Sequence, residues 1–384
     1  MSCIFRSDEE RQVFLTQVDH VFLAIRGDAK FSSIYQQSFT PPNSVLREIE
    51  VRLTEVRARA MSTTVTTEAD GRDDYDCLER FDYQRWTEKG GPLRGTHSTE
   101  GTSFTLHLSE ESVLKVFELI CCSPEASETV TSVALSALIA LAELESFFTP
   151  KGVEAVIEIA YKTRSEITDM RAFEVLLYRI NVLLLACVQH PNAANCNEKL
   201  YITVLNHVLT TYFEASSSPL LRRTAEAAVE TTVRVFFERQ MSRADSSEGA
   251  ALVEFVGQMV RGEILGFQSD GNHITKNDPE VLESLQKAQR NSSEVFGEVP
   301  AIQLAGLRLA TTIVTLLLKQ LRTEEGRHRI SNVLVSAVQD VLARALLIAG
   351  VKCDHVVVLS EVVHVTKLFS NAKLSFLLRK CTTF

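Results

Sequence analysis

No glycine occurs between Gly152 and Gly249, and this gap limits the folds open to the chain. Strands joined by tight turns draw on glycine at many of their connections, so a long glycine-free stretch favours helices. Within it, residues 172–240 form three consecutive amphipathic runs, with Pro191 and Pro219 placed between them. Apolar residues recur at spacings of three and four in each run, which is the period of one helix face. Each run therefore needs a partner helix.

The composition of the whole chain agrees with an all-α soluble protein of about two domains. Only 9 of the 384 residues are proline and 16 are glycine, while 45% are apolar and 23% are charged. The net charge of −9 comes from intermixed signs without a basic block, so nucleic acid is not an expected partner. The apolar stretches at residues 130–142 and 309–318 are shorter than a membrane span of about 20 residues, and we interpret them as buried helices.

Polar residues that can accept hydrogen bonds from a first helical turn mark where further helices begin. Ser7, followed by Glu10, forms a capping box, and Ser109, Asn197 and Ser218 stand at three later starts. Amphipathic runs are expected at residues 7–27, 46–56, 109–120, 128–148, 150–160, 169–184, 249–265, 300–318, 333–346 and 358–369. The periodicity disappears from about residue 61 to 107, where we expect a disordered insertion.

Short turns between about six successive helices in residues 109–240 are typical of an armadillo/HEAT-like helical superhelix. We expect two units: a helical domain at residues 1–240 that contains the insertion 61–107, and a second helical domain at residues 299–384. The weaker segment 241–298 is expected to be a linker. Only three or so helices follow it, so the second domain is expected to be incomplete.

The sequence contains no signature of a common catalytic, cofactor or metal site. Walker, G-x-S-x-G, H-E-x-x-H and paired-cysteine patterns are all missing. Cys187, His190 and Cys196 surround Pro191, but a fourth ligand is lacking and a buried thiol beside a loop histidine is the favoured interpretation. His355 and His364 fall on nearly opposite faces of one helix. We expect no catalytic, cofactor-binding or metal-binding residue.

Three charged residues are candidates for contact with another protein. Arg222 and Arg223 lie in a first helical turn, where a cation is unfavourable, so a phosphate or an acidic partner could account for them; a solvated face is the simpler interpretation. Glu174 lies near a helix start, where a carboxylate is locally stabilising.

Several blocks of sequence, in order, resemble the large guanine-nucleotide exchange factors for Arf GTPases, most closely the Golgi-associated GBF/Gea/GNOM branch. The resemblance to that family's N-terminal dimerisation and cyclophilin-binding domain rests on V-F-L-A-I-R-G-D-A-K-F-S (residues 21–32), F-E-V-L-L-Y-R-I (173–180), L-L-R-R-T-A-E-A-A-V (220–229) and V-F-F-E-R (235–239). Residues 299–380, with I-S-N-V-L-V-S-A-V-Q-D-V-L (330–342) and L-S-F-L-L-R-K (374–380), resemble the start of the next domain, the homology-upstream domain.

This resemblance implies a regulatory region that acts through contacts with other proteins. The expected partners are Arf- and Rab-type GTPases, and self-association is possible. The expected location is the cytoplasm, at the surface of early Golgi membranes. The family's exchange domain and its F-R-x-P-G-E loop are not found, so the chain is not expected to catalyse exchange. The family's self-association contact uses a lysine and a glutamate; the glutamate matches Glu174, but Ala140 occupies the position of the lysine. The family's N-Y-D-C-D box is not reached, and residues 75–77 repeat part of it in the irregular insertion.

Two other functions fit the same periodicity. The chain could be a freestanding helical adaptor unrelated to Arf, which would be indicated if no Arf-pathway protein associates with it. An enzyme with a dispersed active site is the third alternative, and tight binding of a nucleotide or a metal would support it.

Overall fold

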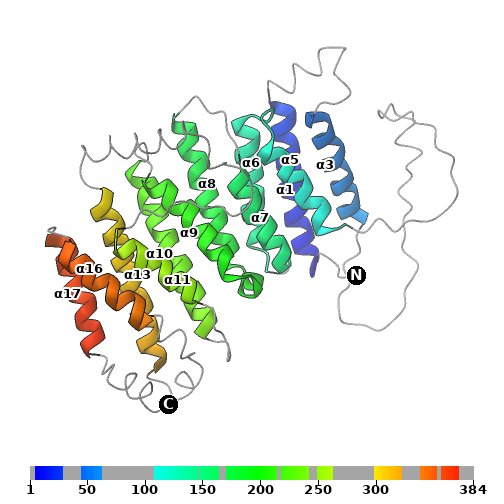
Figure 1. Ribbon diagram of the computed structural model, residues 1–384. Helices are drawn as coiled ribbons and strands as arrows, with labels where there is room; N and C mark the ends of the chain where they lie inside the picture. The colour runs from blue at the N-terminus through cyan, green and yellow to red at the C-terminus, as the bar shows by residue number, and fades with distance from the viewer. Residues whose placement is uncertain are drawn as a thin grey trace, which may run out of the picture. The chain divides into compact units, whose positions relative to one another are not determined.

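The computed structural model describes residues 5–28, 45–62, 108–145, 147–163, 170–213, 218–241, 249–262, 298–321, 338–352 and 356–371. All regular structure in these residues is helical, which confirms the all-α prediction (Figure 1). Most of the expected insertion, residues 63–107, falls outside them. So does residue 355, one of the two histidines considered above.

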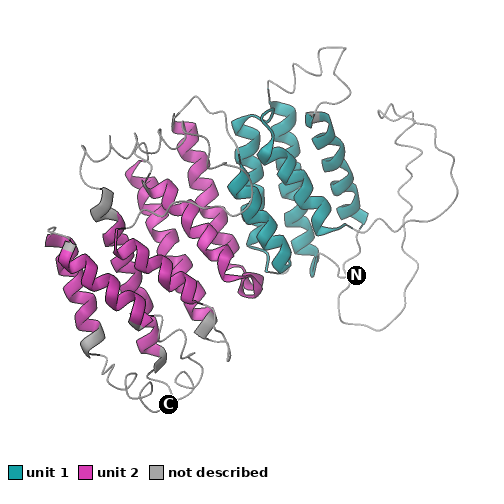
Figure 2. Cartoon of the chain, in the orientation of Figure 1, with its two compact units in different colours: residues 1–167 teal, residues 168–384 magenta. Residues whose placement is uncertain are grey.

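The chain divides into two compact units, residues 1–167 and 168–384 (Figure 2). The sequence analysis predicted the boundary between the two domains later in the chain, at a linker of residues 241–298. Part of that segment is the helix α11 (Ala250–Val260), whose apolar residues are buried in the second unit. The assignment of residues 1–240 to a domain like the dimerisation and cyclophilin-binding domain, and of residues 299–384 to an incomplete domain like the homology-upstream domain, stays a prediction.

The first unit contains five described helices, each with one buried face. Helix α1 packs on α3 and α6, and α5 packs on α3, α6 and α7. Their bounds are Asp8–Gly27 (α1), Val45–Ser62 (α3), Glu110–Cys122 (α5), Glu128–Ala142 (α6) and Pro150–Lys162 (α7).

Local capping defines the starts of these helices as the sequence predicted. The hydroxyls of Ser7 and Ser109 accept hydrogen bonds from the third residues of their helices. Glu10 does reach back, although its carboxylate accepts from the amide of Arg6 rather than from that of Ser7.

Helix α6 is shorter than predicted, because it ends at Ala142 and not near residue 148. Tight turns follow it, in which the amide of Leu144 donates to Leu141 and that of Phe147 to Leu144. The turns place the ring of Phe147 5.5 Å from that of Phe14 and 6.0 Å from that of Phe5, measured between centroids. The aromatic contacts thus replace the last helical turns.

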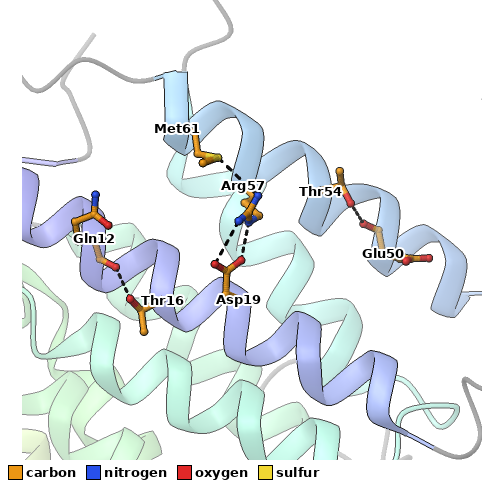
Figure 3. Close-up of polar contacts among 7 residues, drawn as sticks. All are labelled: Gln12, Thr16, Asp19, Glu50, Thr54, Arg57 and Met61. Carbon is orange, nitrogen blue, oxygen red and sulfur yellow. Dashed lines mark hydrogen bonds and ion pairs between the residues drawn. The ribbon is translucent and has the colours of Figure 1, made fainter. Parts of the chain in front are cut away.

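Polar contacts join α1 to α3 at the edge of the first unit (Figure 3). The guanidinium of Arg57 donates to both carboxylate oxygens of Asp19, at 2.6 and 3.4 Å, and this hydrogen bonding raises the pKa of Arg57. Arg26 also pairs with Glu50 at 3.7 Å. Because position increases along α1 as it decreases along α3, the two helices are antiparallel.

The described part of the second unit is also built of helices. Helix α10 packs on α8, α9 and α13, and α11 packs on α9, α13 and α16. The described elements are α8 (Met170–Gln189), the 3-10 helix η1 (Pro191–Asn195), α9 (Glu198–Phe213), α10 (Pro219–Met241), α11, α13 (Glu298–Leu321), the π-helical turn η2 (Val338–Leu342), α16 (Ala343–Lys352) and α17 (Val356–Asn371). The three helices predicted within residues 172–240 are thereby confirmed as α8, α9 and α10.

Glutamates from one helix cap the start of the helix after next in both units. Glu110 of α5 accepts from the amide and the hydroxyl of Thr149, the N-cap of α7, at 2.9 and 2.7 Å. Gly152 leaves room for it, since a Cβ there would lie 1.5 Å from the carboxylate. Glu198 of α9 accepts from the amide of Leu252 in α11 at 2.7 Å. Helices two apart in the sequence therefore begin side by side.

Gly306 allows α13 to approach α11 closely. A Cβ at this position would lie 2.7 Å from the amide nitrogen of Val260 and 2.8 Å from the Cβ of Met259. Because these atoms belong to or adjoin the backbone of α11, they have little freedom to move. We expect Gly306→Ala to lower the free energy of unfolding by about 2 kcal/mol in urea titrations, despite the better helix propensity of alanine.

Gly350→Ala is the matched control for Gly306→Ala. A Cβ on Gly350, within α16, would meet only the side chain of Val362 at 3.7 Å, an ordinary contact. This variant should be neutral or gain about 0.5–1 kcal/mol from helix propensity. Equal effects of the two substitutions would contradict the close approach at Gly306.

Candidate interaction surface

The structure brings the three predicted contact residues to one place, the start of α10. The carboxylate of Glu174, in the second turn of α8, accepts a hydrogen bond of 3.0 Å from the amide of Ser218. Ser218 is itself the cap of α10, and its hydroxyl accepts from the amide of Leu221. Arg222 and Arg223 follow in the first turn of α10 and are exposed. Residues 44 positions apart in the sequence thus meet.

Glu174 has a structural task in this arrangement. Its carboxylate is half-buried and satisfies an amide that would otherwise have no partner within α10. It also places negative charge at the positive end of the helix dipole. Glu174 therefore repeats the role that Glu110 and Glu198 have at α7 and α11.

Replacing Glu174 by alanine should lower the free energy of unfolding by about 1 kcal/mol, because it removes this cap. Urea titration of the purified chain measures the effect. Glu230→Ala, at an exposed position further along α10, is the control and should change stability by less than about 0.5 kcal/mol. An unchanged stability in Glu174→Ala would contradict the capping role.

Exposed apolar side chains surround the same helix starts. Val175 and Tyr178 of α8 are 49% and 44% exposed, and Leu220 of α10 is 69% exposed. Arg171, one turn before Val175, is also exposed. We name this surface the α8–α10 patch and define it by Arg171, Val175, Tyr178, Leu220, Arg222 and Arg223.

Three arginines, Arg171, Arg222 and Arg223, are exposed on the patch. The carboxylate of Glu174 accepts from the backbone of α10 at the positive end of the helix dipole. The next carboxylate of α10, that of Glu226, forms an ion pair with Arg308 of α13. Charge and exposed apolar area together suit contact with a partner better than chemistry on a small molecule.

Sequence reasoning found Arg222 and Arg223 of the patch and the neighbouring Glu174, but it missed Arg171, Val175, Tyr178 and Leu220. The signal was present, because residues 171, 175 and 178 follow the spacing of a second face of α8. It was masked by a stronger stripe on the other side of the helix, where Leu176, Ile180 and Leu184 are buried.

The cysteines and the histidine near Pro191 have other roles. Burial raises the pKa of Cys187, so its thiol stays protonated at neutral pH, whereas a metal ligand is a thiolate. The Nδ1 atom of His190 accepts from the amide of Asn192, and the thiol of Cys196 donates weakly to the carbonyl of the same residue. Within the described ranges, no group of three or more His, Cys, Asp or Glu residues could hold a metal.

Two described helices are long and apolar enough to cross a membrane, judged by length and composition only: Arg171–Gln189 in α8 and Ile302–Lys319 in α13. The second includes the apolar stretch that the sequence analysis considered too short. Both helices pack on others of the second unit, α8 on α9 and α10, and α13 on α10, α11 and α17. Core helices have the same length and composition, so this is weak evidence for a membrane span.

Comparison with known proteins adds one finding. The chain is similar to the ARF guanine-nucleotide exchange factor GNL1 of Arabidopsis thaliana, with 28% identity over 126 residues. A region of this chain is therefore related to an Arf guanine-nucleotide exchange factor. The similarity covers 31% of this chain and 9% of GNL1. No protein-family model matches the chain, and no solved structure matches it.

Proposed function

We propose that this chain is a non-catalytic regulatory and protein-interaction region of an Arf guanine-nucleotide exchange factor. The observation that carries the proposal is the similarity to GNL1, together with its small extent: the similar region corresponds to 9% of that exchange factor. The blocks of sequence that resemble the dimerisation and homology-upstream domains of the GBF/Gea/GNOM branch support the finer assignment.

The proposed mode of action is contact between helical surfaces. Stacked helices whose starts are capped across the stack, as at Glu110, Glu174 and Glu198, suit the armadillo-like arrangement proposed for the chain. Such a surface would bind Arf- or Rab-type GTPases, or a second copy of the chain, on the cytoplasmic side of Golgi membranes during vesicle traffic.

A nucleotide-release assay tests the non-catalytic part of the proposal. Arf GTPases loaded with a fluorescent GDP analogue should release it at the same rate with and without the purified chain. An exchange domain from a known exchange factor is the positive control. A clear acceleration by this chain would overturn the proposal.

Co-precipitation tests the Arf context. A tagged chain expressed in cells should recover Arf-pathway proteins and should lie at the Golgi by fluorescence microscopy. Recovery of other proteins only, with no Golgi localisation, would favour a freestanding helical adaptor. Light scattering of the purified chain measures self-association independently.

A further inference from the structure

We propose that Ser62 is a phosphorylation site for a basophilic protein kinase and that the ion pair between Asp19 and Arg57 restrains its modification. The modification involves no Arf GTPase, so it goes beyond the proposed function. Three features of the first unit indicate it: the sequence before Ser62, the position of this residue at the end of α3, and the contacts of the preceding arginines.

Two arginines precede Ser62 at the positions that basophilic protein kinases recognise. The sequence up to this serine is R-A-R-A-M-S, with Arg57 five and Arg59 three residues before it. Kinases of this class bind both guanidinium groups with carboxylates of their substrate groove, so charge and spacing together select the serine. The pattern R-x-R-x-x-S, or the same pattern with threonine, occurs once in the chain. The two threonines that follow Ser62 do not have this spacing from the arginines.

The hydroxyl that would accept the phosphate lies at the end of a helix. Ser62 is the last residue of α3 and is exposed, and Met61 before it is 55% exposed. The hydroxyl donates to the carbonyl of Arg59 at 3.0 Å, which is a bond within the exposed last turn. Last turns of helices open at low free energy, so this hydroxyl can be released to a kinase.

Opening of α3 from Arg57 onward would release little buried surface. A kinase with this specificity reads six residues of an extended chain, so the recognised segment has to leave the helix. The side chains of Ile49, Leu53, Val56 and Ala60 are buried in α3. Of these, only Ala60, the smallest, lies beyond Arg57. Recognition therefore leaves the larger apolar contacts of α3 in place.

Carboxylates hold both arginines in the folded unit. Arg57 donates to Asp19 of α1 at 2.6 and 3.4 Å and to the sulfur of Met61 at 3.7 Å (Figure 3). Arg59 pairs with Glu55 at 4.0 Å. A kinase has to replace these partners, and the pair with Asp19 ties the recognised segment to α1. The side chains of this pair are 41% and 44% exposed, so the fold slows the modification without preventing it.

The reaction transfers the γ-phosphoryl group of ATP to the Oγ atom of Ser62. A bond forms between Oγ and the γ phosphorus, the bond from this phosphorus to the bridging oxygen breaks, and ADP leaves with the bonding electrons. The hydroxyl proton passes to a base of the kinase. The product carries about two negative charges at the end of α3, where the helix dipole is already negative, and it loses the bond to Arg59. The phosphate should therefore loosen the end of α3.

Phosphorylation of the purified chain tests the proposal. The chain is incubated with ATP and protein kinase B, a basophilic kinase, and mass spectrometry locates the phosphate. We expect phosphate at Ser62, and no phosphate at this position in Ser62→Ala. Asp19→Asn should raise the initial rate about two- to fivefold, because it removes the carboxylate that holds Arg57. Hydrogen exchange in residues 57–62 should be faster in the phosphorylated chain.

Glu48→Gln is the matched control for Asp19→Asn. Glu48 pairs with Arg52 of the same helix at 2.7 Å, but Arg52 lies outside the segment that the kinase recognises. This variant should be phosphorylated at the rate of the unchanged chain. Circular dichroism should confirm that each variant is folded.

Three results would overturn the proposal. The first is the absence of phosphate at Ser62, or its presence only on the threonines that follow. The second is an equal rate for Asp19→Asn and the unchanged chain, or the same increase in Glu48→Gln. The third is slower hydrogen exchange at the end of α3 after phosphorylation.

Discussion

Replacing Arg239 by alanine is expected to lower the free energy of unfolding by about 2–4 kcal/mol. The guanidinium of Arg239, near the end of α10, donates to the carbonyls of Val188, Gln189 and His190 at 2.6, 2.7 and 3.0 Å. These carbonyls lie at the C-terminal end of α8, where the helix itself supplies no further amides, and that of His190 also accepts from the amide of Ala193. The positive charge also lies at the negative end of its dipole.

Urea titration measured by circular dichroism gives the size of the effect. Arg239→Lys keeps the charge but cannot span three carbonyls, so it should recover only part of the loss. Arg234→Ala is the control, because this exposed arginine makes a single long hydrogen bond, of 3.5 Å to Thr231. A loss at Arg239 no larger than that at Arg234 would contradict the capping role.

The second large effect is a loss of stability in acid caused by His207. Burial within α9 lowers the pKa of His207 from 6.5 to about 4. The folded chain therefore binds this proton less readily than the unfolded chain. The contribution is complete above pH 6.5 and is lost as the pH falls, which should cost about 3 kcal/mol by pH 4.

Comparison with His207→Gln isolates this contribution, since protonated carboxylates also weaken the fold in acid. Free energies of unfolding should be measured for both proteins at intervals from pH 7.5 to pH 4. The difference between them should shift by about 3 kcal/mol in favour of the glutamine variant as the pH falls. Parallel curves would show that His207 titrates normally in the folded chain.

The helices that could be predicted from the sequence are those whose starts depend on one nearby residue. Ser7, Ser109, Asn197 and Ser218 all accept hydrogen bonds from the first turns that follow them. Capping of this kind is local, so the sequence contains the whole interaction. The apolar stripes of α9 and α10 are equally local and are buried as expected.

Interactions between distant residues could not be predicted in the same way. The end of α6 depends on the aromatic contacts of Phe147, and the task of Glu174 depends on Ser218 in another helix. Asn181 of α8 is fully buried, although its side-chain amide has no hydrogen-bond partner. Its polar character alone would predict an exposed side chain. The candidate site could therefore be predicted only in part. Glu174, Arg222 and Arg223 could be selected from the sequence, but the exposure of Leu220 beside them could not.

The glutamates that cap the helix after next couple the local unfolding of helix starts. When α8 frays at its beginning, Glu174 withdraws and the amide of Ser218 loses its acceptor, so α10 frays with it. The same holds from α9 to α11 through Glu198. In these pairs, and in α5 and α7 through Glu110, fraying would thus pass from one helix to its second successor. A partner that holds the start of the first helix would therefore also reduce fraying of the second, which it does not contact.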